Sequence, residues 1–82
     1  MQLDNFIEFA VSEKANFGMC LKVAMVKHDV SNIDVANYFG VLPQQVIRWK
    51  HKPEFNIAQL KEMSEFFRIT PSTFVSYGYE KQ

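Results

Sequence analysis

The sequence predicts an all-α domain of five or six short helices around one core. Apolar residues recur at the i, i+3, i+4 spacing of helices, and no two segments show the alternation expected of paired strands. The chain has 82 residues, of which 48% are hydrophobic and 15% aromatic. This length supports one dense core but not two. We therefore predict that residues 1–82 form a single domain.

The first predicted helix belongs to an N-terminal extension, residues 1–16, and the second follows directly. The apolar stripe of the first helix consists of Leu3, Phe6, Ile7, Ala10 and Val11. That of the second consists of Phe17, Cys20, Leu21, Ala24 and Met25. Asn16 and Gly18 are expected to weaken the first helix at its end. The second helix is expected to stop near Asp29.

The third helix, residues 32–39, carries the clearest start and stop signals. Ser31 is the expected N-cap, and Asp34 at the third helical position completes a capping box. Gly40 is expected to end the helix, because glycine adopts the left-handed conformation without a steric penalty.

Two more helices follow the third. Pro43 suits the first position of a helix, where its missing N–H costs nothing, and this helix is expected to run to about His51. Asn56 is the expected N-cap of the next helix. The predicted buried stripe of that helix is Ile57, Leu60, Met63 and Phe67.

A last short helix is predicted over residues 71–77. Thr70 and the proline after it open the helix, and Phe74 and Val75 are expected to face inward. The terminal YGYEKQ is expected to be frayed or to lie at an interface.

Residues 32–51 read as helix, three-residue turn, helix. Close crossing of two such helices needs a small residue, which Ala36 provides, and a glycine at the turn, which Gly40 provides. The apolar residues expected to hold the two helices together are Val35, Phe39, Val41, Val46 and Trp49.

The opposite face of the second of these helices is predicted to contact DNA bases. It carries Gln44, Gln45, Ile47 and Arg48. Glutamine can bond the edge of adenine, arginine can bond guanine through a bidentate fork, and an exposed isoleucine can touch a thymine methyl. The plainer alternative is an ordinary solvated face, with Ile47 incidentally exposed.

The formal net charge is zero, with nine basic and nine acidic residues, which excludes a strongly basic nucleic-acid coat protein. The charge is nevertheless uneven. Residues 48–52 contain Arg48, Lys50, His51 and Lys52 and no acid. The first 13 residues contain Asp4, Glu8 and Glu13 and no base. We expect the basic end to face phosphates and the acidic end to face away from them.

The segment from Leu21 to about Val75 resembles the lambda-repressor/Cro-type (XRE-like) helix-turn-helix family. The strings VSNIDVANYFGVLPQQVIRWKHKP and IAQLKEMSEFFRITPSTFV are similar to the family patterns LSxxELAxxLGVSxxxISxWExG and xxxLxxIAxxLxVSxxxL. The resemblance implies a compact lambda-repressor-like domain, with the N-terminal helix as an addition. It also implies that residues 43–51 are a recognition helix that enters the major groove.

The same resemblance assigns phosphate contacts. Asn32 matches a polar position that bonds a phosphate in the family, and Lys50, His51 and Lys52 add positive charge beside the DNA backbone. Lys50 and Lys52 replace a Glu and a Gly of the family pattern. Leu42 and Pro43 depart from it as well, because the family prefers Ser at the cap; the missing cap bond is worth about 1 kcal/mol.

The resemblance implies a sequence-specific transcriptional regulator, a phage-type or prophage repressor that binds a pseudo-palindromic double-stranded operator as a homodimer. The alternative is an antitoxin or anti-repressor-like module on the same fold, whose main partner is a protein such as a toxin or antirepressor. The acidic, aromatic N-terminus and the neutral pI favour this alternative. Aromatic residues in excess of what the core can bury suggest a dimer interface: Phe6, Phe9, Phe74, Tyr77 and Tyr79.

The sequence offers no catalytic or metal constellation. Cys20 with two histidines does not make a zinc site, and no triad, paired carboxylates or phosphate loop is present, so neither an enzyme nor a cofactor is expected. Cys20 is expected to be a buried, inert thiol. With one cysteine, no signal-peptide pattern and no long apolar run, the expected location is the cytoplasm, without membrane attachment.

Overall fold

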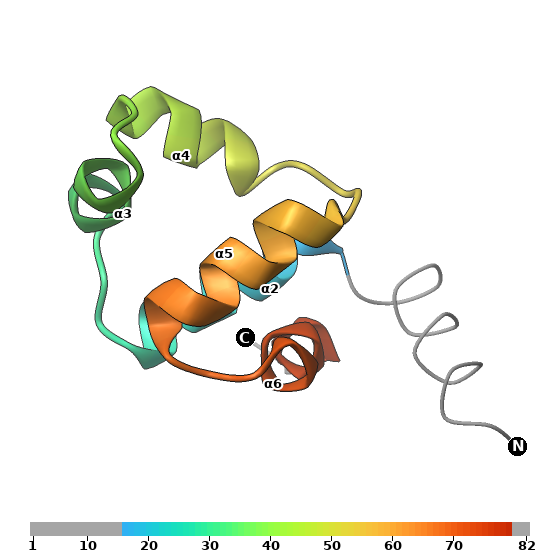
Figure 1. The fold of residues 1–82 in the computed structure, drawn as a ribbon. Helices are drawn as coiled ribbons and strands as arrows, with labels where there is room; N and C mark the ends of the chain where they lie inside the picture. Colours follow the sequence, from blue (N-terminus) through green and yellow to red (C-terminus); the bar gives the residue numbers. More distant parts are fainter. Residues whose placement is uncertain (1–15, 80–82) are drawn as a thin grey trace, which may run out of the picture.

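The computed structural model describes residues 16–79, which form a compact all-α arrangement with no strand in that range (Figure 1). The elements are α2 (Phe17–Lys27), α3 (Asn32–Phe39), α4 (Pro43–Trp49), α5 (Ile57–Phe67), α6 (Pro71–Ser76) and the 3-10 turn η2 (Tyr77–Tyr79). The all-α prediction is confirmed for these residues. The predicted first helix lies outside the described residues, as do Phe6 and Phe9 of the suggested dimer interface.

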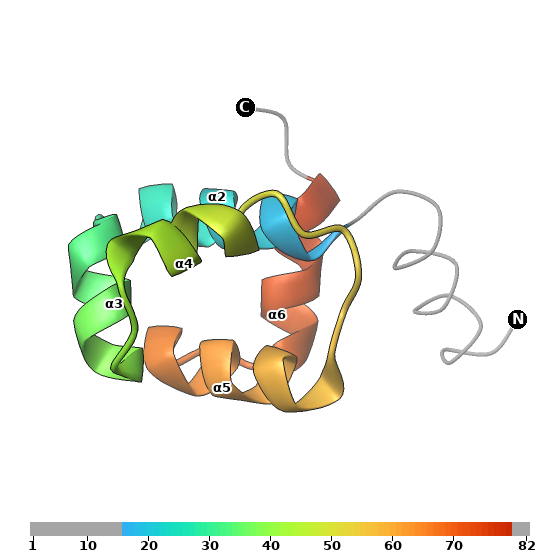
Figure 2. The ribbon, with the colours of Figure 1, turned by 90° about the horizontal axis from the view of Figure 1, so that it is seen from above.

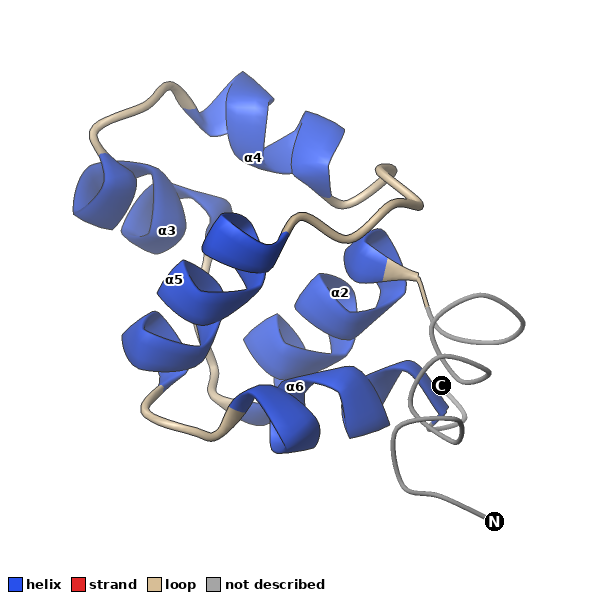
Figure 3. Cartoon of the chain, turned by 45° about the vertical axis from the view of Figure 1, so that its right-hand side comes forward, coloured by secondary structure: helices blue, strands red, loops and turns tan. Residues whose placement is uncertain are grey.

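The helices enclose the core from several sides. In Figure 2, α2 and α5 face each other, while α3 and α6 close opposite ends. α4 packs on α3 and on α2, and α6 packs on both α2 and α5 (Figure 3). α4 therefore has one side on the protein and one side free.

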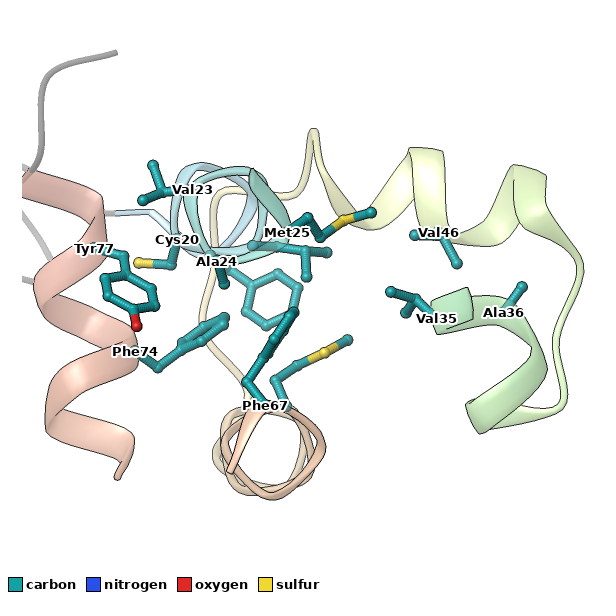
Figure 4. Close-up of a cluster of buried hydrophobic side chains, with 13 residues drawn as sticks. Cys20, Val23, Ala24, Met25, Val35, Ala36, Val46, Phe67, Phe74 and Tyr77 are labelled. Carbon is teal, nitrogen blue, oxygen red and sulfur yellow. The ribbon is translucent and has the colours of Figure 1, made fainter. Parts of the chain in front are cut away.

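The core is centred on α2. All five residues of its predicted apolar stripe are buried. Figure 4 shows Phe67, Phe74 and Tyr77 gathered towards α6, and Val35, Ala36 and Val46 at the α3–α4 end. The buried residues form one apolar cluster that runs from the α6 side to the α3–α4 end. Burying each of its large apolar side chains contributes about 1.5–3 kcal/mol.

The start of α2 differs from the sequence-based expectation. Asn16 is its N-cap, and its Oδ1 accepts a hydrogen bond from Met19 N at 2.8 Å. Gly18 is buried against the backbone of Lys50, where a side chain would not fit. Both residues therefore build this junction, while the helix that they were expected to weaken lies outside the described residues.

The start and stop signals of α3 are confirmed. Ser31 Oγ accepts from Asp34 N at 3.1 Å, and Asp34 Oδ2 accepts from Ser31 N at 3.0 Å. Gly40 has φ 69° and ψ 36°, in the left-handed region. Together these caps fix the helix at residues 32–39, as predicted.

α4 is shorter than predicted, since it ends at Trp49 and not at His51. Leu42 caps it without a side-chain hydrogen bond, as expected from the missing serine. Asn56 caps α5 as predicted, with Oδ1 accepting from Gln59 N at 3.2 Å.

The predicted buried stripe of α5 is wrong at Ile57. Met63 and Phe67 are buried and Leu60 is half-buried, but Ile57 is 86% exposed. Residues 56–58 are all exposed, so the helix begins beyond the edge of the core. Ser64 is buried instead, and its hydroxyl donates to Leu60 O at 2.8 Å.

Two of the three C-terminal aromatic residues suggested for a dimer interface, Phe74 and Tyr77, are used in the core, whereas Tyr79 is exposed. Phe74 is fully buried and Val75 half-buried. The predicted helix over residues 71–77 ends at Ser76 and continues as η2. Tyr77 is only 8% exposed, and its hydroxyl is 3.2 Å from His28 Nε2. The expectation of a frayed end or an interface is therefore wrong for Tyr77.

Candidate nucleic-acid interface

A short turn positions α4 against α3. Val41 N donates to Ala36 O at 3.0 Å after the left-handed Gly40. Phe39 and Trp49 meet edge to face, with ring centroids 5.7 Å apart, and both are half-buried. Val35, Ala36 and Val46 are buried between the two helices and the rest of the core. These contacts fix which face of α4 is turned inward.

The free face of α4 brings together three of the four predicted base-contacting residues. Gln44, Gln45 and Arg48 line one shallow pocket, together with Val41, Leu42 and Trp49. Gln44 and Arg48 are exposed and Gln45 is half-buried. Ile47 is 44% exposed but does not line this pocket. The pocket thus combines amide and guanidinium donors with an apolar floor.

The predicted phosphate-contacting residues lie at the end of α4 and at the start of α3. Lys50 Nζ donates to Asn32 Oδ1 at 2.9 Å. Lys52 Nζ donates to Gln59 Oε1 at 2.8 Å and lies 5.6 Å from the centroid of the Phe17 ring. His51 is exposed.

Both lysine partners are neutral amides. A neutral acceptor orients an ammonium group without cancelling its charge, so Lys50 and Lys52 remain cations that can attract an anion. We refer to Arg48, Lys50 and Lys52 together as the basic surface.

Sequence reasoning missed two residues at this site. Lys22 lines a groove with Lys50, Asn32 and Ser31, although it lies 28 positions before Lys50 in the chain. Gln59 holds Lys52 from α5. Lys22 could have been noticed as a cation opposite the apolar stripe of α2, but only the fold brings it to Lys50.

Asp29 and Asp34 are the acidic residues nearest to the start of α3. Asp29 lines the same groove as Lys22 and has φ 54°. The backbone N–H of Ser31, and second its hydroxyl, lower the pKa of Asp34. Asp34 is therefore a stable anion whose charge is committed to capping α3.

Cys20 takes no part in the site. Its thiol is buried under α6, with Sγ 3.5 Å from Val75 O, and burial raises its pKa to about 12. The thiol is therefore neutral at pH 7, as expected of an inert core residue.

The described part of the chain contains no group of three or more histidine, cysteine, aspartate or glutamate side chains placed to hold a metal ion. Between residues 16 and 79, none of the helices has the length and apolar character needed to cross a bilayer.

The described residues thus define a compact all-α domain with a short, amide-rich helix face beside a basic surface. Comparisons with protein-family models, curated proteins and solved structures find no match to this chain.

Proposed function

We propose that this protein is a sequence-specific DNA-binding transcriptional regulator with a lambda-repressor-like helix-turn-helix fold. The observation that carries the proposal is the orientation of α4: Val46 is buried against the protein, while Gln44 and Arg48 are exposed on the free face. A helix anchored in this way could enter a groove of DNA with its polar face towards the base edges.

α4 matches the major groove in size and chemistry. A helix with its side chains is about 10–12 Å across, and the groove is about 12 Å wide. Gln44 and Gln45 can each pair with adenine N6 and N7, and Arg48 can pair with guanine O6 and N7. Each good bidentate pair supplies about 1–3 kcal/mol of discrimination, and Ile47 can add contact with a thymine methyl.

The two lysines of the basic surface would hold the DNA backbone while Arg48 and the glutamines of α4 read the bases. Asn32, Lys50, His51 and Lys52 flank the reading residues and would contact phosphates. The Asn32–Lys50 hydrogen bond places an amide and an ammonium side by side, so one phosphate could accept from both. These contacts set affinity and register but carry no sequence information.

A homodimer would complete the site. One helix of seven residues covers only a few base pairs, and two copies placed about 34 Å apart would read the two halves of a pseudo-palindrome. Occupying a promoter in this way excludes polymerase, so the proposed role is that of a phage-type repressor acting in the cytoplasm.

The alternative is a protein-interaction module of the antitoxin or anti-repressor kind on the same fold. An exposed tyrosine that lies on a half-buried phenylalanine favours it. Tyr38 on α3 is 59% exposed, and its ring centroid lies 4.7 Å from that of Phe66 on α5. An exposed tyrosine supported by a second ring is a typical anchor for a protein partner.

The test is binding to short duplexes from the DNA that flanks the protein's own gene, at low and moderate salt. Affinity should fall by about 0.9 log unit per log unit of salt for each phosphate contact. Arg48→Ala should cost about 1–3 kcal/mol on the preferred duplex. Arg48→Lys should keep the salt dependence but lose the preference, because lysine lacks the bidentate fork.

Lys61→Ala is the matched control, since it removes one positive charge from an exposed position of α5. It should leave the preferred duplex bound almost as tightly as before. Equal losses from Arg48→Ala and Lys61→Ala, or no preference over random DNA, would reject DNA reading by α4 and favour the protein-partner alternative.

A further inference from the structure

A groove between the end of α2 and the start of α3 contains two lysines from distant parts of the chain. Lys22 on α2 and Lys50, directly after α4, both line it, and both are half-buried. Asn32, the first residue of α3, lines it as well, and its Oδ1 accepts from Lys50 Nζ at 2.9 Å. The groove therefore gathers two ammonium groups and one amide from three separate elements.

The packing of α2 explains why the two lysines share this groove. A Cβ on Gly18 would overlap the backbone of Lys50, so Lys50 lies against the first turn of α2. Lys22 comes four residues after Gly18, on the same face of the helix. The side chain of Lys50 then reaches Asn32 at the start of α3. The backbone contact at one end and the hydrogen bond at the other thus hold Lys50 along the face that carries Lys22.

No ion pair neutralises the two positive charges of the groove. Asp29 is the one acid that lines it, and within residues 16–79 no carboxylate lies in ion-pair contact with Lys22 or Lys50. The other lining residues are apolar or neutral: Met25, Val26, Val30 and Ser31. Two like charges in one groove repel each other, whereas an anion between them would gain from both. The electrostatics of the groove therefore favour an anionic ligand.

We propose that this groove binds a phosphate group, held by the ammonium groups of Lys22 and Lys50 and by the amide N–H of Asn32. A phosphate has several acceptor oxygens, so it can accept from all three, and lysine binds phosphate as a point charge. In the complex with DNA the group would be a backbone phosphate, which extends the interface from α4 to α2. That assignment rests on the proposed function. A free phosphate compound has the same chemistry, and the tests below separate the two sources.

The first test uses inorganic phosphate and no DNA. Phosphate is titrated into the protein at constant ionic strength, with chloride as the replaced anion, and two-dimensional amide NMR follows the binding. Saturable shifts should appear at residues 22, 29–32 and 50, and Lys22→Gln should weaken them. Glutamine suits a helix about as well as lysine, so α2 should stay folded. Lys61→Gln is the matched control, because it removes the same charge from an exposed position of α5.

Asp29→Asn tests the groove with the opposite sign, because it removes the one acid that lines it. Asp29 has φ 54°, and asparagine tolerates this left-handed conformation, so the turn should be kept. Asp29→Asn should bind phosphate more tightly than the unchanged protein, and Lys22→Gln more weakly, each by about 2- to 5-fold. Equal affinities in all three proteins, or an equal loss in Lys61→Gln, would overturn the phosphate site.

The second test measures how binding to the preferred duplex depends on salt. Lys22→Gln should lower the slope of log affinity against log salt by about 0.9 and leave the preferred sequence unchanged, whereas Lys22→Arg should keep the slope. An unchanged slope in Lys22→Gln, together with specific phosphate shifts, would support a site for a free phosphate compound and overturn the contact with DNA. If no duplex is bound, the proposed function fails, and the phosphate titration alone decides whether the groove is a phosphate site.

Discussion

Gly18 and Lys50 are in backbone contact: a Cβ built on Gly18 would overlap the carbonyl carbon and oxygen of Lys50. The contact joins the first turn of α2 to Lys50, the residue directly after α4. Because Lys50 begins the loop of the basic surface, this junction sets where that loop leaves the core. The absence of a side chain at position 18 is therefore a requirement of packing.

Gly18→Ala is expected to destabilise the protein, although alanine favours helix by about 1 kcal/mol. The new methyl meets backbone and not a flexible side chain, so α2 and the loop must separate, at a cost of about 1–3 kcal/mol. Each kcal/mol lowers Tm by about 4–8 °C in a domain of this size. Thermal unfolding followed by circular dichroism measures the change, and an unchanged or raised Tm would contradict the contact.

Gly40 offers a matched comparison, because the space around it is open. Its φ of 69° makes the cost of Gly40→Ala purely conformational, about 1–2 kcal/mol. Gly40→Asn should recover most of that loss, since asparagine tolerates the left-handed region. The corresponding Gly18→Asn should be no better than Gly18→Ala.

The capping box of α3 is expected to make stability depend on pH in acid. Ser31 lowers the pKa of Asp34 below its usual value of 3.8 in the folded protein. The carboxylate therefore stabilises the fold above that pH, and the contribution is lost as pH falls through the lower folded pKa. Urea unfolding from pH 7 downwards should show a shallower acid loss for Asp34→Asn. Parallel curves for the two proteins would refute this role.

Burial of Cys20 is expected to make the stability of the fold depend on pH in alkaline solution. Its folded pKa of about 12 exceeds the unfolded value of 9.0, because burial disfavours the thiolate. The stabilisation is present below pH 9.0 and is lost progressively as pH rises towards 12. A thiol reagent at pH 8 should label the native protein slowly and the urea-unfolded protein rapidly. Fast labelling without denaturant would show that the thiol is accessible.

Local signals account for the parts of the fold that the sequence predicts correctly. Ser31, Asp34 and Gly40 act on residues at most four positions away, so their chemistry is readable in order along the chain. The inward face of α2 is equally local, because its stripe is complete within three turns.

The missed features all depend on distant partners. Gly18 and Lys50 are 32 positions apart, and Tyr77 lies 49 positions after His28. Ile57 has the right spacing for burial, but the core ends before the first turn of α5. Spacing along a helix says which residues share a face, not how far the neighbouring helices extend over it.

The candidate site likewise has one part that the sequence predicts and one part that depends on distant partners. Gln44, Gln45 and Arg48 are neighbours on one short helix, so their shared position at one pocket can be expected from their spacing. Asn32 as the acceptor for Lys50, and Gln59 as the acceptor for Lys52, require three helices to be placed correctly.

Lys50 and Gln44 are expected to differ in what they contribute to DNA binding. Lys50→Ala should weaken binding to every duplex by a similar factor and should lower the salt slope by about 1, because it removes a phosphate contact. Gln44→Ala should leave the slope unchanged and relax the preference at one base position, at a cost of about 1–3 kcal/mol on the preferred duplex. Titrations against the preferred duplex and its single-base variants, at several salt concentrations, separate the two effects. Lys61→Ala serves as the control for Lys50, because it removes a positive charge from an exposed position of α5, away from the residues proposed to contact DNA. A slope lowered by Gln44→Ala and not by Lys50→Ala would reverse the two roles and place the base-reading surface outside α4.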